Sequence, residues 1–147
     1  MFASPIGPLR FAASGRGLTR VCFEGEPLPI DEPPVSPLVT QELAEYFAGT
    51  RREFTVLLDL SGVTEFRAAV LRELAKVPFG ETTTYAQLAR AVGNPKAVRA
   101  VGSACATNPL PLFIPCHRVL RSDGQLGGYR GGVEAKRFLL RMEGIDV

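Results

Sequence analysis

The sequence predicts an α+β protein with a small N-terminal β-sheet lobe that includes one helix. A mostly helical C-terminal domain follows, with a helix-turn-helix and the candidate active-site cysteine. Apolar residues alternate with other residues near the start of the chain, as in strands, and recur at helical spacing in the second half. A polar, glycine-containing segment, residues 59–64, separates the two regions, so we expect domains at residues 1–60 and 64–147.

The chain opens with a hairpin pattern. Leu9, Phe11 and Ala13 alternate with other residues, and the Gly-Arg-Gly segment at 15–17 follows them. An apolar alternation that leads into a glycine turn is typical of two antiparallel strands, so residues 18–23 are predicted to form the second strand.

A loop, a helix and one more strand complete the predicted N-terminal lobe. Five prolines occur between Pro27 and Pro37 and predict a loop. Ser36 and Pro37 have the residue types of a helix cap and first turn, and the helix is predicted to end at Gly49. The last predicted strand rests on three alternating apolar residues, Phe54, Val56 and Leu58.

Three helices are predicted to follow. Phe66, Val70 and Leu74 fall on one helical face, and a Pro-Phe-Gly segment at 78–80 stops that helix. Thr84 with Gln87 three residues later forms a capping-box pattern for a short second helix.

The third helix completes a helix-turn-helix pattern. Gly93 ends the second helix, and Asn94 with Pro95 can cap and begin the third, whose sequence at 96–107 is rich in Ala, Gly and Ser. A helix-turn-helix places its second helix in a DNA groove. Helical hairpins of this kind also serve as ordinary packing units, so the pattern by itself leaves DNA binding open.

Composition and length indicate an ordinary globular protein. The chain has 147 residues, of which 46% are hydrophobic and 22% charged. No apolar stretch approaches the roughly 20 residues of a membrane span, and the first residues lack a secretory signal, so we expect a cytoplasmic protein with no membrane partner. Three cysteines and one histidine form no C-x-x-C pair or zinc set, which predicts free thiols and no metal.

Charge is distributed unevenly. Residues 1–63 carry 5 Lys and Arg against 8 Asp and Glu, whereas residues 64–147 carry 12 against 7. Between residues 85 and 141 there are 9 Lys and Arg against 2 Asp and Glu. This excess of positive charge favours binding to a polyanion such as DNA. A merely solvated basic face explains the charge equally well.

The only histidine follows a cysteine directly. A thiolate is the reactive form of cysteine, and a nearby imidazole changes how readily it forms. Residues 112–114 are expected to run extended through the core and deliver Cys116 to a pocket. Neighbouring side chains of an extended segment point to opposite faces, so Cys116 and His117 interact only if the chain turns sharply after Pro115 or a water bridges them. An inert buried thiol and a purely structural histidine remain alternatives.

Several motifs together resemble a known family. The segment 115–119, Pro-Cys-His-Arg-Val, follows residues 93–102 and the pair Asn108-Pro109, and Glu143-Gly144 comes later. In this order the motifs resemble the O⁶-alkylguanine-DNA alkyltransferases, or methylated-DNA–protein-cysteine methyltransferases. The resemblance extends from residue 66 to 144 and is faint before it. It implies single-turnover repair of O⁶-alkylguanine, and of O⁴-alkylthymine, with no cofactor.

The resemblance assigns roles to five residues. Cys116 would accept the alkyl group, and Tyr85 would donate a proton to a ring nitrogen of the leaving guanine. His117 would act on Cys116 through a water, while Glu143 would fix the imidazole tautomer and favour its charged form. Asn108 would brace the turn before the cysteine segment by bonding backbone groups.

The substrate pocket is assigned in the same way. Backbone groups of Cys116 and Val119 would accept from the guanine amine, and the amide of Arg130 would donate toward its oxygen. Tyr129 and the adjacent glycines, including Gly131, would form the wall. Arg130 stands where many relatives carry a small hydroxyl residue, so pocket width and DNA affinity are open.

The resemblance also implies how double-stranded DNA containing alkylated guanine is bound. The damaged nucleotide must leave the base stack, and Arg99 would fill the space while its helix lies in the minor groove. A solvated charge and a packing helix are the alternatives. The other predicted DNA-binding residues are Tyr85, Asn94, Ala97, Ala100, Gly102, Ser103, Ser122 and Arg67.

The alkyltransferase is expected to be a monomer, and two competing functions remain open. A lesion-recognising module that does not repair DNA is disfavoured because such proteins carry another residue in place of Cys116. A Cys-His hydrolase of acyl or peptide bonds would leave the basic second half without a purpose.

Overall fold

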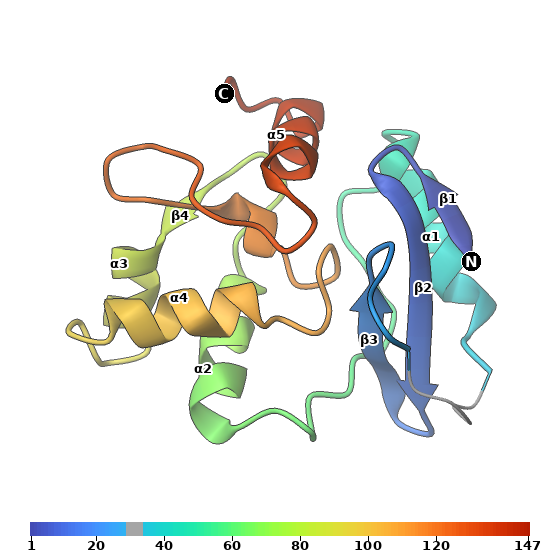
Figure 1. The fold of residues 1–147 in the computed structure, drawn as a ribbon, viewed down its shortest axis with the longest axis horizontal. Helices are drawn as coiled ribbons and strands as arrows, with labels where there is room; N and C mark the ends of the chain where they lie inside the picture. The colour runs from blue at the N-terminus through green and yellow to red at the C-terminus, as the bar shows by residue number, and fades with distance from the viewer. Residues whose placement is uncertain (29–33) are drawn as a thin grey trace. The chain divides into compact units, whose positions relative to one another are not determined.

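The computed structural model describes residues 1–28 and 34–147, which form two compact units, Met1–Gly62 and Val63–Val147 (Figure 1). The middle of the predicted proline-rich loop, residues 29–33, lies outside the described residues. Within the described part of the chain, no helix is long and apolar enough to cross a membrane. The predicted α+β class is confirmed, with an antiparallel sheet in the first unit and most of the helices in the second.

The first unit is built on a three-stranded antiparallel sheet in the order β1-β2-β3. The strands are β1 (Phe2–Ser4), β2 (Gly7–Ser14) and β3 (Gly17–Cys22), and the predicted hairpin is the β2–β3 pair. Its register places Phe11 opposite Val21, with an irregularity between Ala12 and Ala13. Leu9, Leu18 and Val21 are almost fully buried. Ala12 is also buried whereas Phe11 is half-buried, so burial along β2 follows the alternation of the sequence only in part.

The helix of this unit is α1 (Pro37–Phe47), and it begins as predicted. The hydroxyl of Ser36 accepts a hydrogen bond from the amide of Leu38, with Pro37 in the first turn. Leu43 and Tyr46 are buried. The helix therefore contributes an apolar face to the core of the first unit.

The prediction of a last strand from Phe54 to Leu58 is wrong. Only Leu58 is paired, through an isolated bridge to Leu18. The amides of Thr55 and Val56 instead donate to the carboxylate of Glu42, at 2.8 and 3.1 Å. A side chain thus satisfies backbone groups that a neighbouring strand would otherwise bond, and no ladder forms along this segment.

The second unit contains α2 (Glu65–Leu74), α3 (Tyr85–Ala91), α4 (Val98–Ala106) and α5 (Val133–Met142). The first three pack on one another, and α3 with α4 forms the predicted helix-turn-helix. The predicted capping box is present: Thr84 and Gln87 exchange hydrogen bonds of 3.1 and 3.0 Å.

The predicted start of α4 is wrong. Asn94 and Pro95 lie in a turn, where the carbonyl of Asn94 accepts from the amide of Ala97 at 2.9 Å. The helix begins only at Val98. Gly93 has a φ of +78°, and the turn that follows it contains the residues that would form the first turn of a longer helix.

A short parallel pair connects the helix-turn-helix to the cysteine segment. Strand β4 (Thr83–Thr84) pairs with β5 (Val119–Leu120), and β5 directly follows the 3₁₀ helix η1 (Cys116–Arg118). Because α3 begins at Tyr85, immediately after β4, this pairing places the start of α3 beside the end of the Cys116 turn.

Candidate active site

A folded turn held by Asn108 delivers Cys116. The side-chain amide of Asn108 donates to the carbonyl of Ile114 at 3.0 Å, and its oxygen accepts from the amide of Leu110 at 2.9 Å. The chain therefore folds back between Leu110 and Ile114, whose backbone groups also bond at 2.8 Å. Asn108 is buried, so these bonds occur away from water and hold the turn firmly.

The expectation that residues 112–114 run extended is wrong. Leu112 has a φ of +76°, which places it in the left-handed region and reverses the chain. Cys116 then opens η1, where the amide of Arg118 donates to the carbonyl of Pro115 at 2.9 Å. The sharp turn after Pro115 is thus present, and strand alternation does not apply to Cys116 and His117.

A carboxylate distant in sequence binds the histidine. Nε2 of His117 lies 2.8 Å from an oxygen of Glu143, the residue that follows α5. Arg118 donates to the same carboxylate through Nε at 2.8 Å and Nη2 at 3.0 Å, and its Nη1 bonds the carbonyl of Val77 at 2.7 Å. All three side chains are buried, and Glu143 is held from two sides.

This arrangement determines the tautomer of His117. A carboxylate accepts hydrogen bonds, so Nε2 of the neutral ring carries the proton and donates it to Glu143. Nδ1 then carries the free lone pair of the ring, which can accept a proton. Nδ1 is buried and has no hydrogen-bond partner among the residues that the structure describes. The ring therefore offers one basic nitrogen for a proton.

As expected, Glu143 favours the charged imidazole, but burial and two nearby cations oppose it. Burial lowers the pKa of His117, whereas Glu143 raises it and the charges of Arg118 and Lys136 lower it further. The net direction is downward, because burial outweighs a carboxylate whose charge is shared with Arg118. The resting imidazole is neutral and can act as a base.

The thiol of Cys116 is also neutral at rest. Burial raises its pKa, and the opposing hydrogen bond from Asn108 and the charges of Arg130 and Lys136 do not overcome this effect. A buried thiol must lose its proton before it can attack carbon. The site therefore pairs a protonated thiol with a neutral imidazole in the neighbouring residue.

Cys116 lines a cavity of about 380 Å³, which we call the Cys116 cavity. Its lining residues are Tyr85, Gly102, Cys105, Ala106, Cys116, Gly128, Tyr129 and Arg130. Four predicted site residues thus line the same cavity as Cys116: Tyr85, Gly102, Tyr129 and Arg130. Val119 and Gly131 are not among the described residues that line the cavity, and the carbonyl of Val119 accepts from Nζ of Lys136 at 2.7 Å.

The phenol of Tyr85 stays protonated in this cavity. Burial raises its pKa, and negative charge on Cys105 or Cys116 would raise it further. Tyr85 can therefore donate a hydrogen bond to a group bound beside the sulfur.

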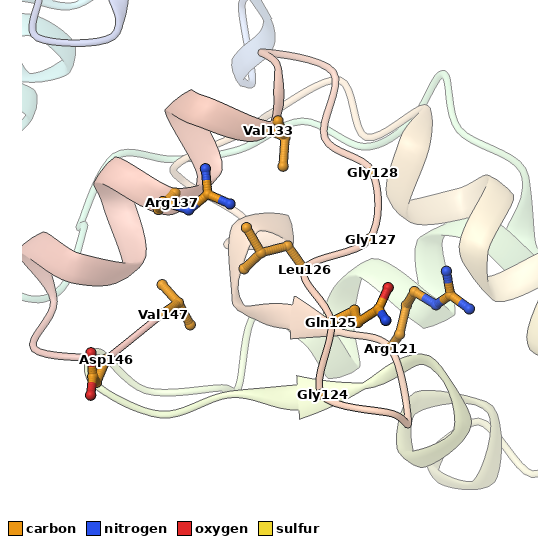
Figure 2. Close-up of a pocket in the computed structure, with 10 residues that line it drawn as sticks. All are labelled: Arg121, Gly124, Gln125, Leu126, Gly127, Gly128, Val133, Arg137, Asp146 and Val147. Atoms are coloured by element: carbon orange, nitrogen blue, oxygen red, sulfur yellow. The ribbon is translucent and has the colours of Figure 1, made fainter.

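A larger cavity of about 740 Å³ lies elsewhere in this unit (Figure 2). The segment after β5, helix α5 and the chain end line it, with Leu126 and Val147 among its side chains. Its two arginines, Arg121 and Arg137, have carboxylate partners, and none of the predicted catalytic residues lines it. We place the candidate active site in the smaller cavity, because Cys116, the predicted nucleophile, lines it.

The predicted DNA-binding residues are mostly exposed, but they do not all lie on α4. Arg99, Ala100 and Ser103 are exposed residues of α4, and Gly102 is half-buried. The others lie on other elements or on loops: Ala97 caps α4, Asn94 is in the preceding turn, Ser122 follows β5, Tyr85 begins α3, and Arg67 is a half-buried residue of α2.

The sequence interpretation missed Lys136. This residue of α5 is 0% exposed, and its Nζ donates to the carbonyls of Val119 and Gly128 at 2.7 and 3.2 Å. Burial lowers its pKa to about 8, although negative charge on Cys116 and Cys105 would raise it. A signal existed, because Lys136 lies three and four residues before the core residues Leu139 and Leu140, on the apolar face of the helix.

A metal centre has no evident ligands in the described ranges 1–28 and 34–147, which contain no group of three His, Cys, Asp or Glu side chains that could hold an ion. All three cysteines are free and buried.

Comparison with known proteins covers both units. Residues 65–145 match the family model of the 6-O-methylguanine DNA methyltransferase DNA-binding domain, and residues 1–60 match that of its ribonuclease-like domain. A methylated-DNA–protein-cysteine methyltransferase from Methanosarcina acetivorans is 41% identical over 151 residues, covering 98% of this chain and 96% of the relative.

Solved structures give the same result. The crystal structure of Mycobacterium tuberculosis OGT in complex with DNA has a TM-score of 0.89 and 41% identity, covering 97% of this chain and 89% of that chain. The Schizosaccharomyces pombe Atl1 complex with DNA containing O6-carboxymethylguanine is more distant, with a TM-score of 0.52 and 31% identity. It covers 56% of this chain and 78% of that chain.

Proposed function

The chain belongs to the 6-O-methylguanine DNA methyltransferase family, and from this premise we propose that Cys116 is the residue that accepts the alkyl group. The activity is repair of DNA by direct transfer of an alkyl group from O⁶-alkylguanine to a protein cysteine. The observation that carries the assignment is that Cys116 and Tyr85 line one cavity, while His117 beside the cysteine is hydrogen-bonded to Glu143.

The first chemical step removes a proton from the thiol. The proton of Cys116 passes through a bridging water to Nδ1 of His117, and Glu143 stabilises the imidazolium that forms. Because both groups are neutral at rest, negative charge develops on sulfur only when a base accepts the proton. Arg118 holds the Glu143 carboxylate in position throughout.

The second step is displacement at carbon. The sulfur of Cys116 forms a bond to the alkyl carbon, the bond from that carbon to O⁶ breaks, and its electron pair moves into the guanine. The phenol of Tyr85 donates a proton to a ring nitrogen, so guanine leaves as a neutral base. The proton that His117 received returns to the tyrosine through solvent, and the balance is thiol plus alkylguanine to thioether plus guanine.

The reaction ends with the protein consumed. A thioether on Cys116 has no good leaving group, so no later step of this mechanism restores the thiol. Each molecule therefore repairs one lesion. O⁴-Alkylthymine, whose alkyl carbon is also bound to an exocyclic oxygen of the base, is proposed as a second substrate.

Recognition of double-stranded DNA is assigned to α4. Its exposed small residues Ala100 and Ser103 allow close approach to the minor groove, and the exposed Arg99 can occupy the space of an extruded nucleotide. Asn94, Ser122 and Arg67 are proposed phosphate contacts. The basic surplus between residues 85 and 141 supports this assignment, which predicts affinity that falls with salt.

We also place the active protein in the cytoplasm as a monomer. Three free cysteines suit a reducing compartment. The two alternative functions are not favoured: the thiol at position 116 argues against a module that does not repair DNA, and family membership argues against a hydrolase.

The deciding experiment weighs the intact protein after incubation with a duplex that carries one O⁶-methylguanine. We expect every active molecule to gain one methyl group, located on the Cys116 peptide, with no turnover beyond one equivalent. Cys116→Ser should gain none and still bind the duplex. Cys22→Ser, a buried cysteine of the first unit, is the matched control and should react normally. Methylation at another residue would contradict the assignment.

A further inference from the structure

Arg130 lies at the wall of the Cys116 cavity, and a defined contact holds its side chain there. Its Nη1 donates to the backbone carbonyl of Asn108 at 2.7 Å. The bond spans 22 residues and connects the segment before α5 with the turn that delivers the cysteine. The guanidinium is partly buried, so this contact is better shielded from solvent than a surface bond.

The residue that holds Arg130 also holds the nucleophile. The side chain of Asn108 bonds Leu110 and Ile114, and its hydrogen bond to Cys116 lowers the pKa of that thiol. Arg130 is therefore fixed to the main chain of the residue whose side chain supports the sulfur. The distance between guanidinium and sulfur is set by this turn rather than by a flexible surface side chain.

The two cationic side chains near the sulfur differ in the pH range over which they keep their charge. Arg130 and Lys136 both lower the pKa of Cys116, with Arg130 the larger effect. Lys136 has a pKa of about 8 and loses its charge as the pH rises through that value. A guanidinium stays protonated over this range. The other titratable groups coupled to the sulfur or adjacent to it are Tyr85, Cys105 and His117.

We propose that the side chain of Arg130, anchored on the carbonyl of Asn108, is the fixed counter-charge for the sulfur of Cys116 and a positioning residue for alkyl transfer. This inference rests on the proposed function of Cys116, and it assigns a role to the side chain, where the substrate contact expected of Arg130 uses only its backbone amide. As the proton leaves for His117, charge builds on a sulfur that burial disfavours as an anion, and the guanidinium offsets that cost.

Two substitutions separate charge from hydrogen bonding. Arg130→Gln removes the charge and keeps a donor for the Asn108 carbonyl, whereas Arg130→Lys keeps a charge on a differently shaped side chain. The matched control is Arg137→Gln, which removes a guanidinium of the same unit that pairs with Glu134 and does not line the Cys116 cavity.

The readout is the rate at which iodoacetamide alkylates Cys116 across the pH range, followed by peptide mapping to separate Cys116 from Cys22 and Cys105. We expect Arg130→Gln to shift the inflection of the rate profile upward by about one pH unit and to slow the reaction at neutral pH about tenfold. Arg130→Lys, whose ammonium is protonated at neutral pH, should react there within about threefold of the wild-type rate. Arg137→Gln should keep the wild-type inflection. Arg130→Ser lacks both the charge and the hydrogen bond, so its inflection should shift at least as far as that of Arg130→Gln. It serves as the neutral variant if Arg130→Gln does not fold.

An unchanged inflection in the neutral variants overturns the proposal. So does an Arg130→Lys profile that matches Arg130→Gln, because bond geometry rather than charge would then be responsible. Methyl transfer from the lesion-bearing duplex is measured in parallel with the same variants. If wild-type protein reacts with iodoacetamide but never accepts methyl from DNA, the proposed function fails while the inference on charge is still decided by the pH profiles.

Discussion

Within the described residues, each unit buries one glutamate, and the two carboxylates have different partners. Glu42 of α1 accepts from the amides of Thr55 and Val56 and from the hydroxyl of Thr55 at 2.5 Å. Glu143, after α5, binds the side chains of His117 and Arg118 instead. Glu42 thus binds backbone amides of a loop segment, whereas Glu143 binds and orients an imidazole ring.

The difference shows how burial of a charge relates to function. The partners of Glu42 are chiefly groups that do not titrate, so its carboxylate holds a connection together and has no proton to relay. Glu143 shares a proton with a base whose other nitrogen is unpaired among the described residues. A buried carboxylate indicates a reactive site only when its partner can change protonation state.

The largest expected effect comes from substituting the two glutamates in parallel. Glu143→Gln should slow methyl transfer per folded molecule by about 10²- to 10⁴-fold, because the imidazolium loses its carboxylate and the tautomer is no longer enforced. Glu42→Gln should leave that rate unchanged. Single-turnover transfer from a methylated duplex, normalised to folded protein, measures both, and equal losses in the two variants would remove the distinction.

The same pair should also differ in stability. Glu143→Gln leaves the buried Arg118 without its carboxylate and is expected to reduce the free energy of unfolding by about 3–5 kcal/mol. Glu42→Gln disturbs bonds to uncharged groups chiefly and should cost about 1–3 kcal/mol. Urea denaturation measures both values. A greater loss for Glu42→Gln would reverse the ranking.

Asn108→Ala tests whether the turn before Cys116 depends on side-chain bonds in the way that the segment held by Glu42 does. It leaves the amide of Leu110 and the carbonyl of Ile114 unpaired in the core, so we expect a loss of about 1–3 kcal/mol. The thiol of Cys116 loses a supporting hydrogen bond as well, and its pKa should rise further. Urea denaturation and a thiol titration provide the two measurements; a stable variant with an unchanged thiol would contradict both.

Acid should affect the two sites at different pH. The pKa of His117 is lowered in the folded protein, so its contribution to stability is complete above 6.5 and declines as the pH falls below that value. The pKa of Glu42 is also lowered, despite burial, so its contribution declines only below 4.5. Denaturation curves between pH 7 and 4 should show an earlier loss that His117→Gln removes. A loss confined to pH values below 4.5 would contradict this order.

The smallest expected effect concerns a half-buried carboxylate, Asp59, which sharpens the contrast with the two buried ones. Its hydrogen bond from Ser14, at 2.6 Å, is the largest cause that lowers its pKa to about 2. Ser14→Ala should move that pKa toward 3.8, observed by NMR titration, with no change in methyl transfer. An unchanged pKa would show that the bonds from Ser61 are sufficient.

Several features followed from local sequence alone. The alternation around Phe11 determined the hairpin, and Thr84 with Gln87 determined the start of α3, because hydrogen bonds over a few residues decide such elements. The adjacency of Cys116 and His117 was evident in the same way. A reactive pair could thus be predicted, together with the segment that carries it.

Tertiary structure decided what surrounds that pair. Glu143 lies 26 residues from His117, and Glu42 lies 13 residues from the segment that it holds, so no local pattern reveals either bond. The reversed turn at Leu112 depends on bonds from Asn108, and the protonation of Cys116 depends on burial. Sequence determined which groups are available, whereas their distances and desolvation, which set their chemistry, exist only in the folded chain.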